Sequence, residues 1–325
     1  MKSYIVKLKS KLGRLPEFED YKELMDENQL DSKLEYINKL YPKKLNADSI
    51  DDMELELKKM LFDEIQSITY FLSGKDKEFF LRYISKLEIE ALQNIIQAIL
   101  NHSLDRNINN LEKDPFSKKF NIDVDMNYND FVSTLKNTRY HRTLVPFSRE
   151  NMPEDSMIFL ITNSLMKFYF RDLFDYIGKF PTNVKDELDD YLGKEVDLYN
   201  IEMIYRLKKY FKLNDYEIFN YLIEGGSYIR TDKLKELIGM SVDEFIEYIK
   251  STKYRSIFSG EHSFGISMII EKYKWMKKLQ RSENPILFMI YGINKIYYSM
   301  ETLISTLEID DSFTQKEKEE YIIVR

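Results

Sequence analysis

The chain has 325 residues, with 48 lysines and arginines against 55 aspartates and glutamates, a net charge of -7, three histidines and no cysteine. The absence of cysteine excludes disulfide scaffolds, thiolate zinc sites, iron-sulfur clusters and thiol nucleophiles. With 43% apolar and 14% aromatic residues, the composition excludes intrinsic disorder and supports one large core or two to three smaller ones. We therefore expect a folded, soluble protein that is held together by packing.

Residues that break helices are rare along the chain. There are 10 glycines and 7 prolines, whereas average usage would give roughly 39 in total. The apolar-polar alternation of strands is also scarce, so the sequence predicts an all-α protein. The longest apolar stretches, near 157–160 and 285–293, are shorter than the roughly 20 residues of a membrane span. The net acidic charge disfavours nucleic acid as a partner.

Three helical segments share one pattern. Each has an apolar pair at positions i and i+3, then a tyrosine four or five residues later, then basic residues. The tyrosines are Tyr41, Tyr140 and Tyr254. Their spacing predicts three similar helical units, with boundaries at 1–115, 116–225 and 226–325.

Each predicted unit continues with helix-periodic sequence and finishes in a closing helix. The apolar stripe of the first unit is expected to end at Ser73-Gly74, and that of the second at Gly178. The closing helices are predicted at 88–99, 195–206 and 291–307. Their apolar pairs can be superposed: Leu92 and Ile95, Ile201 and Ile204, and Met300 and Leu303.

The closing helix at 195–206 carries two polar residues on its apolar face. The helical phase places Asp197 and Asn200 beside Ile201 and Ile204, whereas Arg206 points the other way. Burying an unpaired polar group costs roughly 1 to 3 kcal/mol. The pair is therefore expected to tie down a neighbouring helix end or turn. Two alternatives are that it faces a partner's groove, or that Asp197 is a helix N-cap.

The segment after this helix reads as two short helices separated by a glycine turn. Asn214 or Asp215 is expected to cap the first helix, Gly225-Gly226 to end it, and Thr231 or Asp232 to begin the next. A double glycine can also cradle phosphate. No Lys-Ser/Thr pair of a P-loop follows it, so we interpret it as a turn and expect that the isolated chain neither binds nor hydrolyses ATP.

No residue cluster indicates catalysis or metal binding. The three histidines are scattered, and the calcium-loop-like run from Asp123 has Tyr128 and Thr134 where glycine and glutamate are required. Glu261-His262-Ser263 contains the residue types of a catalytic triad, but residues adjacent in sequence do not thereby have the geometry of a triad, so we do not interpret this segment as one. The sequence therefore predicts no catalytic, cofactor or metal site.

The best local match to a known family begins at the closing helix of the second unit. Residues 195–208 carry an acid, an asparagine and an Arg-x-Lys pair, followed by a short helix, a turn at Gly226 and a Thr-x-Tyr ending at Tyr254. This block resembles the C subunit of bacterial and archaeal V-type (A-type) ATPases, equivalent to the d subunit of eukaryotic vacuolar ATPases. The other closing helices depart from the pattern: Ala91 and Gln97 in the first, Ser299 and Ser305 in the last.

The resemblance implies a funnel-like body of three pseudo-equivalent bundles on the cytoplasmic face of the membrane. Such a protein links the central stalk to the proteolipid ring and transmits torque, without catalysis, a cofactor or a membrane span of its own. Six residues are then expected to be structural or partner-facing: Asp197, Asn200, Arg206, Tyr41, Tyr140 and Tyr254. The alternatives are a stand-alone helical adaptor, or an enzyme with a pocket of perturbed carboxylates or histidines.

Overall fold

The computed structural model describes residues 3–27, 29–41, 44–149, 154–211, 213–309 and 312–323. All regular elements in these ranges are helices and no strand occurs in them, so the predicted all-α class is confirmed. Among the same residues, no helix combines the length and the apolar character of a membrane span.

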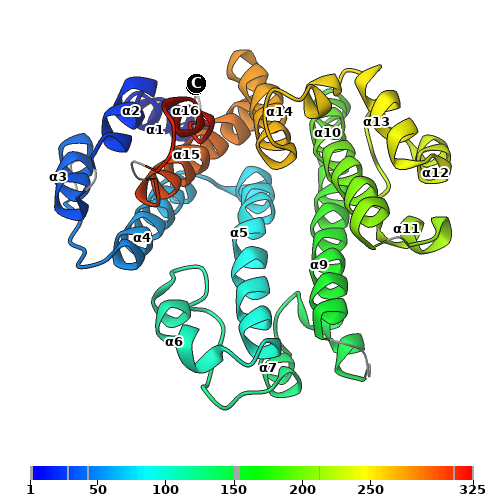
Figure 1. The fold of residues 1–325 in the computed structure, drawn as a ribbon, viewed down its shortest axis with the longest axis horizontal. Coiled ribbons are helices and arrows are strands. Elements are labelled where there is room, and N and C mark those ends of the chain that lie inside the picture. The colour runs from blue at the N-terminus through cyan, green and yellow to red at the C-terminus, as the bar shows by residue number, and fades with distance from the viewer. Residues whose placement is uncertain are drawn as a thin grey trace. The chain divides into compact units, whose positions relative to one another are not determined.

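The chain divides into two compact units, which are coloured along the sequence in Figure 1. We call residues 1–57 with 180–325 the discontinuous unit, and residues 58–179 the inserted unit. Helix α4 (Ile50–Thr69) begins in the first and ends in the second. The predicted equivalence of three units, 1–115, 116–225 and 226–325, stays a prediction.

The inserted unit is built on two long helices, α5 (Gly74–Leu100) and α9 (Glu154–Ile177), which pack against each other. As predicted, α9 ends just before Gly178. Helix α4 instead ends at Thr69, and Gly74 opens α5 with a φ of 53°, a left-handed conformation that glycine adopts without steric cost. The short helices of this unit are α6 (Leu104–Lys113), α7 (Tyr128–Thr134), α8 (His141–Leu144) and the 3-10 helix η1 (Val145–Arg149).

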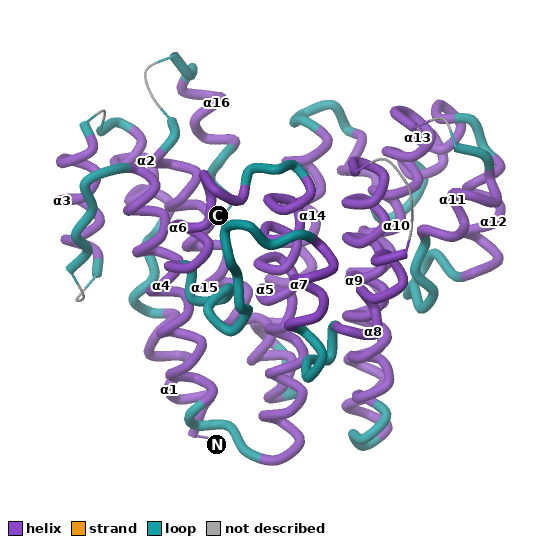
Figure 2. Tube along the Cα trace, turned by 90° about the horizontal axis from the view of Figure 1, so that it is seen from below, coloured by secondary structure: helices purple, strands orange, loops and turns teal. Residues whose placement is uncertain are grey.

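The discontinuous unit packs its first and last helices together. Helix α15 (Pro285–Leu307) lies against α1 (Ser3–Leu12), α2 (Phe18–Met25) and α14 (Phe264–Lys278), which are labelled in Figure 2. A Cβ atom on Gly292 would lie 2.4 Å from the Leu8 side chain, so glycine lets α1 approach α15 closely.

The middle of the discontinuous unit begins with α10 (Thr182–Arg206), which packs on α14 and runs directly into the π-helical turn η2 (Leu207–Phe211). The remaining elements are α3 (Leu30–Leu40), α11 (Asp215–Tyr221), α12 (Thr231–Gly239), α13 (Val242–Lys250), η3 (Arg255–Phe258), η4 (Leu279–Arg281) and α16 (Gln315–Glu320).

Each predicted closing helix is the C-terminal part of a longer helix. Residues 88–99 lie in α5, 195–206 in α10 and 291–307 in α15. The apolar pairs that the sequence superposes are all buried: Leu92, Ile95, Ile201, Ile204, Met300 and Leu303. Of the first tyrosine segment, residues 42 and 43 lie outside the described residues.

Candidate functional site

Asp197 lies on α10 and accepts hydrogen bonds from three donors. The backbone N–H of Tyr228 donates to Oδ2 at 2.8 Å, and the N–H of Ile229 donates to Oδ1 at 2.9 Å. The hydroxyl of Tyr254 donates to Oδ2 at 2.7 Å. One carboxylate therefore joins α10 both to the turn before α12 and to the loop after α13.

The three donors suit a carboxylate at position 197 and a protonated phenol at position 254. Burial raises the pKa of Asp197, while the three donated hydrogen bonds oppose that rise. Burial and the neighbouring Asp197 both raise the pKa of Tyr254, so the phenol keeps the proton that it donates. An ionised carboxylate is an acceptor only, whereas an amide would set its own N–H groups against the backbone donors.

Asn200 makes a second buried link from α10. Its Nδ2 donates to the carbonyl of Ile223 at 2.7 Å, and its Oδ1 accepts from the N–H of the same residue at 2.9 Å. Asp197 and Asn200 are both 0% exposed, which confirms the predicted burial and bonding to backbone at a turn. This geometry favours the structural interpretation over the partner-facing one. The N-cap alternative for Asp197 is wrong, because α10 begins at Thr182.

Glycine allows the turn to come this close to α10. A Cβ atom on Gly226 would lie 2.3 Å from Oδ1 of Asp197 and 2.4 Å from the carbonyl of Ile229. On the helix side, a Cβ on Gly193 would lie 2.7 Å from the backbone nitrogen of Ser227. Of the two predicted caps of α11, the structure selects Asn214, whose side chain accepts from the N–H of Glu217 at 3.0 Å.

Tyr140 of the inserted unit has the same local construction as Tyr254. Its hydroxyl donates to Oε2 of Glu88 on α5 at 2.6 Å, and its N–H donates to Oγ1 of Thr138 at 3.3 Å. The N–H of Tyr254 likewise donates to Oγ1 of Thr252, at 3.1 Å. We call Thr138, Arg139, Tyr140 and Glu88 the Tyr140 site, and Thr252, Lys253, Tyr254 and Asp197 the Tyr254 site.

Both sites also place a cation near the tyrosine ring and at least one further aromatic ring. The guanidinium of Arg139 lies 5.9 Å from the ring centroid of Tyr140 and 5.1 Å from that of Phe168. The ammonium of Lys253 lies 5.1 Å from the ring centroid of Tyr254 and 5.4 Å from that of Trp275. These distances permit cation-π attraction, which strengthens as water is excluded.

Glu88 is the site residue that the sequence analysis missed. The register that aligns Asn200 with Ala91 also aligns Asp197 with Glu88, so the signal is present in the sequence. The same register places Ile296 of α15 at the acid position. On that helix the structure instead joins the hydroxyl of Tyr21 to Oγ of Ser299, 2.7 Å apart and buried.

The other predicted residues are placed differently. Tyr41 is buried and directly follows α3, and its equivalence with Tyr140 and Tyr254 stays a prediction. Arg206 ends α10 on the exposed side, as predicted, and pairs with Glu202 at 3.2 Å. Its contact with a partner stays a prediction. Within the described part of the chain, no group of His, Asp and Glu side chains is arranged to hold a metal ion.

Comparisons with known proteins give the family. Residues 5–287 match the family model described as ATP synthase (C/AC39) subunit. The C subunit of the A-type ATP synthase of Methanosarcina mazei is 27% identical over 205 residues, 62% of this chain and 54% of that protein. The protein of the same name from Methanosarcina barkeri is 31% identical over 133 residues, 41% of this chain and 34% of that protein. The one from Methanococcoides burtonii is 21% identical over 228 residues, 69% of this chain and 62% of that protein.

The chain thus spans about half the length of the Methanosarcina mazei protein, and the family model covers most of the chain. The resemblance that the block from 195 to 254 indicated is confirmed, and the chain belongs to the ATP synthase (C/AC39) subunit family.

Proposed function

We propose that this chain is a non-catalytic central-rotor subunit of a V-type (A-type) ATPase. It links the central stalk to the membrane proteolipid ring on the cytoplasmic face and transmits torque between ATP turnover and ion movement. The observation that carries the proposal is the family match over residues 5–287. The relatives are named as the C subunit of A-type ATP synthases, which agrees with it.

The packing of the discontinuous unit supports a mechanical role. A protein that transmits torque must resist deformation between the surfaces that it joins. Asp197 and Asn200 hold α10 to both ends of the connection between α11 and α12 through buried hydrogen bonds, which are directional and fix those elements in place. Buried Lys33 donates to the carbonyls of Thr306 and Leu307, both at 3.0 Å, and so holds the end of α15.

The glycine turn supports a role without phosphoryl transfer. In a P-loop, backbone N–H groups point at the phosphates of the nucleotide. Here the N–H groups of Tyr228 and Ile229 donate to the chain's own Asp197. The turn therefore holds an internal carboxylate in the place where a P-loop would hold a ligand.

Copurification tests the proposal. The chain, tagged at one end, is expressed in its own host, extracted from membranes in mild detergent and purified, and its partners are identified by mass spectrometry. We expect head, stalk and proteolipid subunits in a fixed ratio. An Arg206→Ala variant tests the predicted partner contact, and Lys39→Ala, which removes another exposed basic side chain, is its control. Recovery of the wild-type chain without ATPase subunits would favour a stand-alone adaptor.

A further inference from the structure

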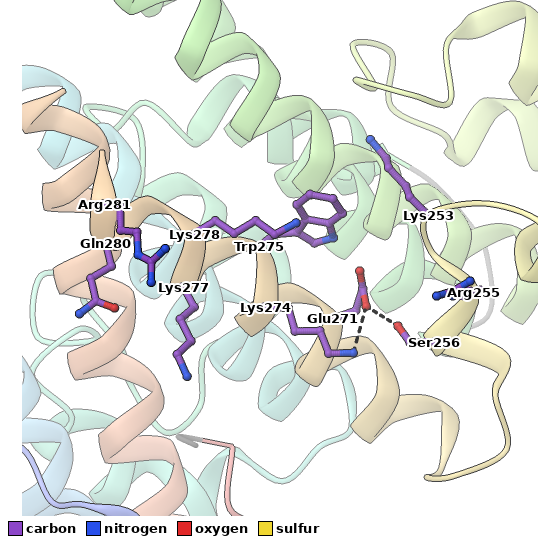
Figure 3. Close-up of a pocket in the computed structure, with 10 residues that line it drawn as sticks. All are labelled: Lys253, Arg255, Ser256, Glu271, Lys274, Trp275, Lys277, Lys278, Gln280 and Arg281. Atoms are coloured by element: carbon purple, nitrogen blue, oxygen red, sulfur yellow. Dashed lines mark hydrogen bonds and ion pairs between the residues drawn. The ribbon is translucent and has the colours of Figure 1, made fainter. Parts of the chain in front are cut away.

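A basic pocket lies in the discontinuous unit beside the Tyr254 site. It has a volume of about 670 Å³, and Figure 3 shows its lining side chains. Six of them are cationic: Lys253, Arg255, Lys274, Lys277, Lys278 and Arg281. Because the chain as a whole carries a net charge of -7, this concentration of positive charge runs against its average composition.

Two elements supply the cations. Lys274, Lys277, Lys278 and Arg281 follow each other at i, i+3, i+4 and i+7, and therefore share one face where α14 runs into η4. Lys253 lies in the connection between α13 and η3, Arg255 is the first residue of η3, and both approach from the opposite side in Figure 3. The pocket is therefore basic on two walls.

Little negative charge within the pocket compensates these cations. Glu271 is the one carboxylate among its lining residues; it is buried, accepts from the hydroxyl of Ser256 and lies 3.7 Å from the ammonium of Lys274. In the described part of the chain, no carboxylate lies within ion-pair distance of Lys253, Arg255, Lys278 or Arg281.

Three lysine ammonium groups lie close to the indole ring of Trp275. The ammonium of Lys278 lies 3.7 Å from the indole centroid, that of Lys194 at 4.9 Å and that of Lys253 at 5.4 Å. Burial lowers the pKa of Lys253. The positive charges of Lys194 and Lys278 lower this pKa further, whereas the carboxylates of Asp197 and Asp190 raise it. Lys194 also forms an ion pair with Asp190, whereas Lys253 and Lys278 repel each other, and an anion bound beside these two would relieve that repulsion.

We propose that this pocket binds a compact anion that carries phosphate, either free phosphate or the headgroup of an anionic phospholipid. Lysine and arginine are the side chains that bind phosphate, arginine through its planar fork and lysine as a point charge. The positive charges surround a single cavity, so they can all act on one small ligand with a high negative charge, such as a phosphate group. In an extended acidic peptide the carboxylates are spread out, because the chain advances about 3.3 Å per residue. The inference rests on the pocket alone and goes beyond the rotor function.

The test uses the full-length chain and two probes. Inorganic pyrophosphate is titrated in a calorimeter, and flotation is measured with phosphatidylcholine vesicles that contain or lack phosphatidylglycerol. The variant Lys278→Glu/Arg281→Glu reverses two pocket charges. Its control, Lys118→Glu/Lys136→Glu, makes the same change of charge on exposed lysines of the inserted unit. Unfolding midpoints establish that both variants are folded.

We expect saturable binding of at least one probe, weakened about tenfold or more by the pocket variant and little changed by the control. Binding of pyrophosphate without flotation assigns the pocket to a soluble phosphate anion, and flotation that requires phosphatidylglycerol assigns it to the headgroup. Three results would overturn the proposal. They are no binding of either probe, equal loss of binding in the two variants, and binding of polyglutamate in place of both probes, which would assign the pocket to an acidic protein segment.

Discussion

The Tyr254 site and the Tyr140 site share a local construction but differ in what their carboxylates join. In both, a threonine Oγ1 accepts from the N–H of a tyrosine two residues later, and the phenol donates to an acid on a long helix. Asp197 of the Tyr254 site is fully buried and also binds two backbone N–H groups. Glu88 of the Tyr140 site has a side chain that is 32% exposed and pairs with Lys119.

The residues three positions after the two acids also differ. Asn200 of α10 binds both backbone groups of Ile223, whereas the aligned Ala91 of α5 has no polar side chain. One repeated motif thus serves as a buried link between three elements in the discontinuous unit. In the inserted unit it is a simpler contact that a surface lysine completes. Burial and the number of donors, more than the phenol-acid pair itself, set the expected contribution of each site to stability.

The largest expected effect is that of Asp197→Ala. The change leaves two backbone N–H groups and the phenol of Tyr254 without their acceptor in a buried place, so the free energy of unfolding should fall by about 3 kcal/mol. Glu88→Ala, the matched change at the part-exposed Glu88, should cost less than about 1 kcal/mol. Denaturant unfolding of the isolated chain measures both. Equal losses would contradict the distinction between the sites.

Gly226→Ala should have the next largest effect. The new methyl group would overlap Oδ1 of Asp197 and the carbonyl of Ile229, so we expect a loss of about 2 kcal/mol. Gly265→Ala is the control, because a Cβ atom added there would meet no atom within 4 Å. Since Gly226 and Asp197 are in contact, the double variant should lose less than the sum of the two single losses. Full additivity would show that they act separately.

Removing each phenolic hydroxyl compares the two pairs directly. Tyr254→Phe should cost about 1.5 kcal/mol, because a buried carboxylate loses one of its donors. Tyr140→Phe should cost about 0.5 kcal/mol, since water and Lys119 can replace the bond to the part-exposed Glu88. Thermal unfolding midpoints of the two variants rank them. A larger effect at Tyr140 would reverse the comparison.

The smallest expected effect is seen only at alkaline pH, as a change in how stability depends on pH. Burial raises the pKa of both Tyr140 and Tyr254 above the ordinary value of 10.0. The folded chain holds these protons more tightly than the unfolded chain, so the contribution is complete below pH 10.0 and stability falls as the pH rises above it. Each Tyr→Phe variant should show a shallower fall. Tyrosinate absorbance followed together with helix content measures it, and ionisation of either phenol in the folded chain would contradict the assignment.

The sequence predicts those features that depend on helix geometry alone. The 3.6-residue period places Asp197 and Asn200 on the buried face of α10, and the same period places Arg206 on the exposed side. The cap at Asn214 and the end of α9 before Gly178 also follow from local chemistry. Gly74 was predicted to end a helix and instead begins one, because a glycine between two helices can serve either end.

The partners of these residues depend on tertiary packing. Tyr254 meets Asp197 from 57 residues away, and Tyr21 meets Ser299 from 278 residues away. The periodicity of a single helix cannot predict contacts between residues that are so far apart in the sequence. The basic face of 274–281 can be read from its spacing, but Lys253 and Arg255 join it only when the segment after α13 packs on α14.

The coupling of ATP hydrolysis to ion movement tests the proposed rotor function most directly. ATPase complexes purified from cells that contain or lack this chain are reconstituted into vesicles, and ATP hydrolysis and ATP-driven ion uptake are measured in parallel. We predict that complexes without the chain still hydrolyse ATP but do not drive uptake, and that adding the purified wild-type chain restores uptake. Ion uptake at the wild-type ratio to hydrolysis in its absence would contradict the account.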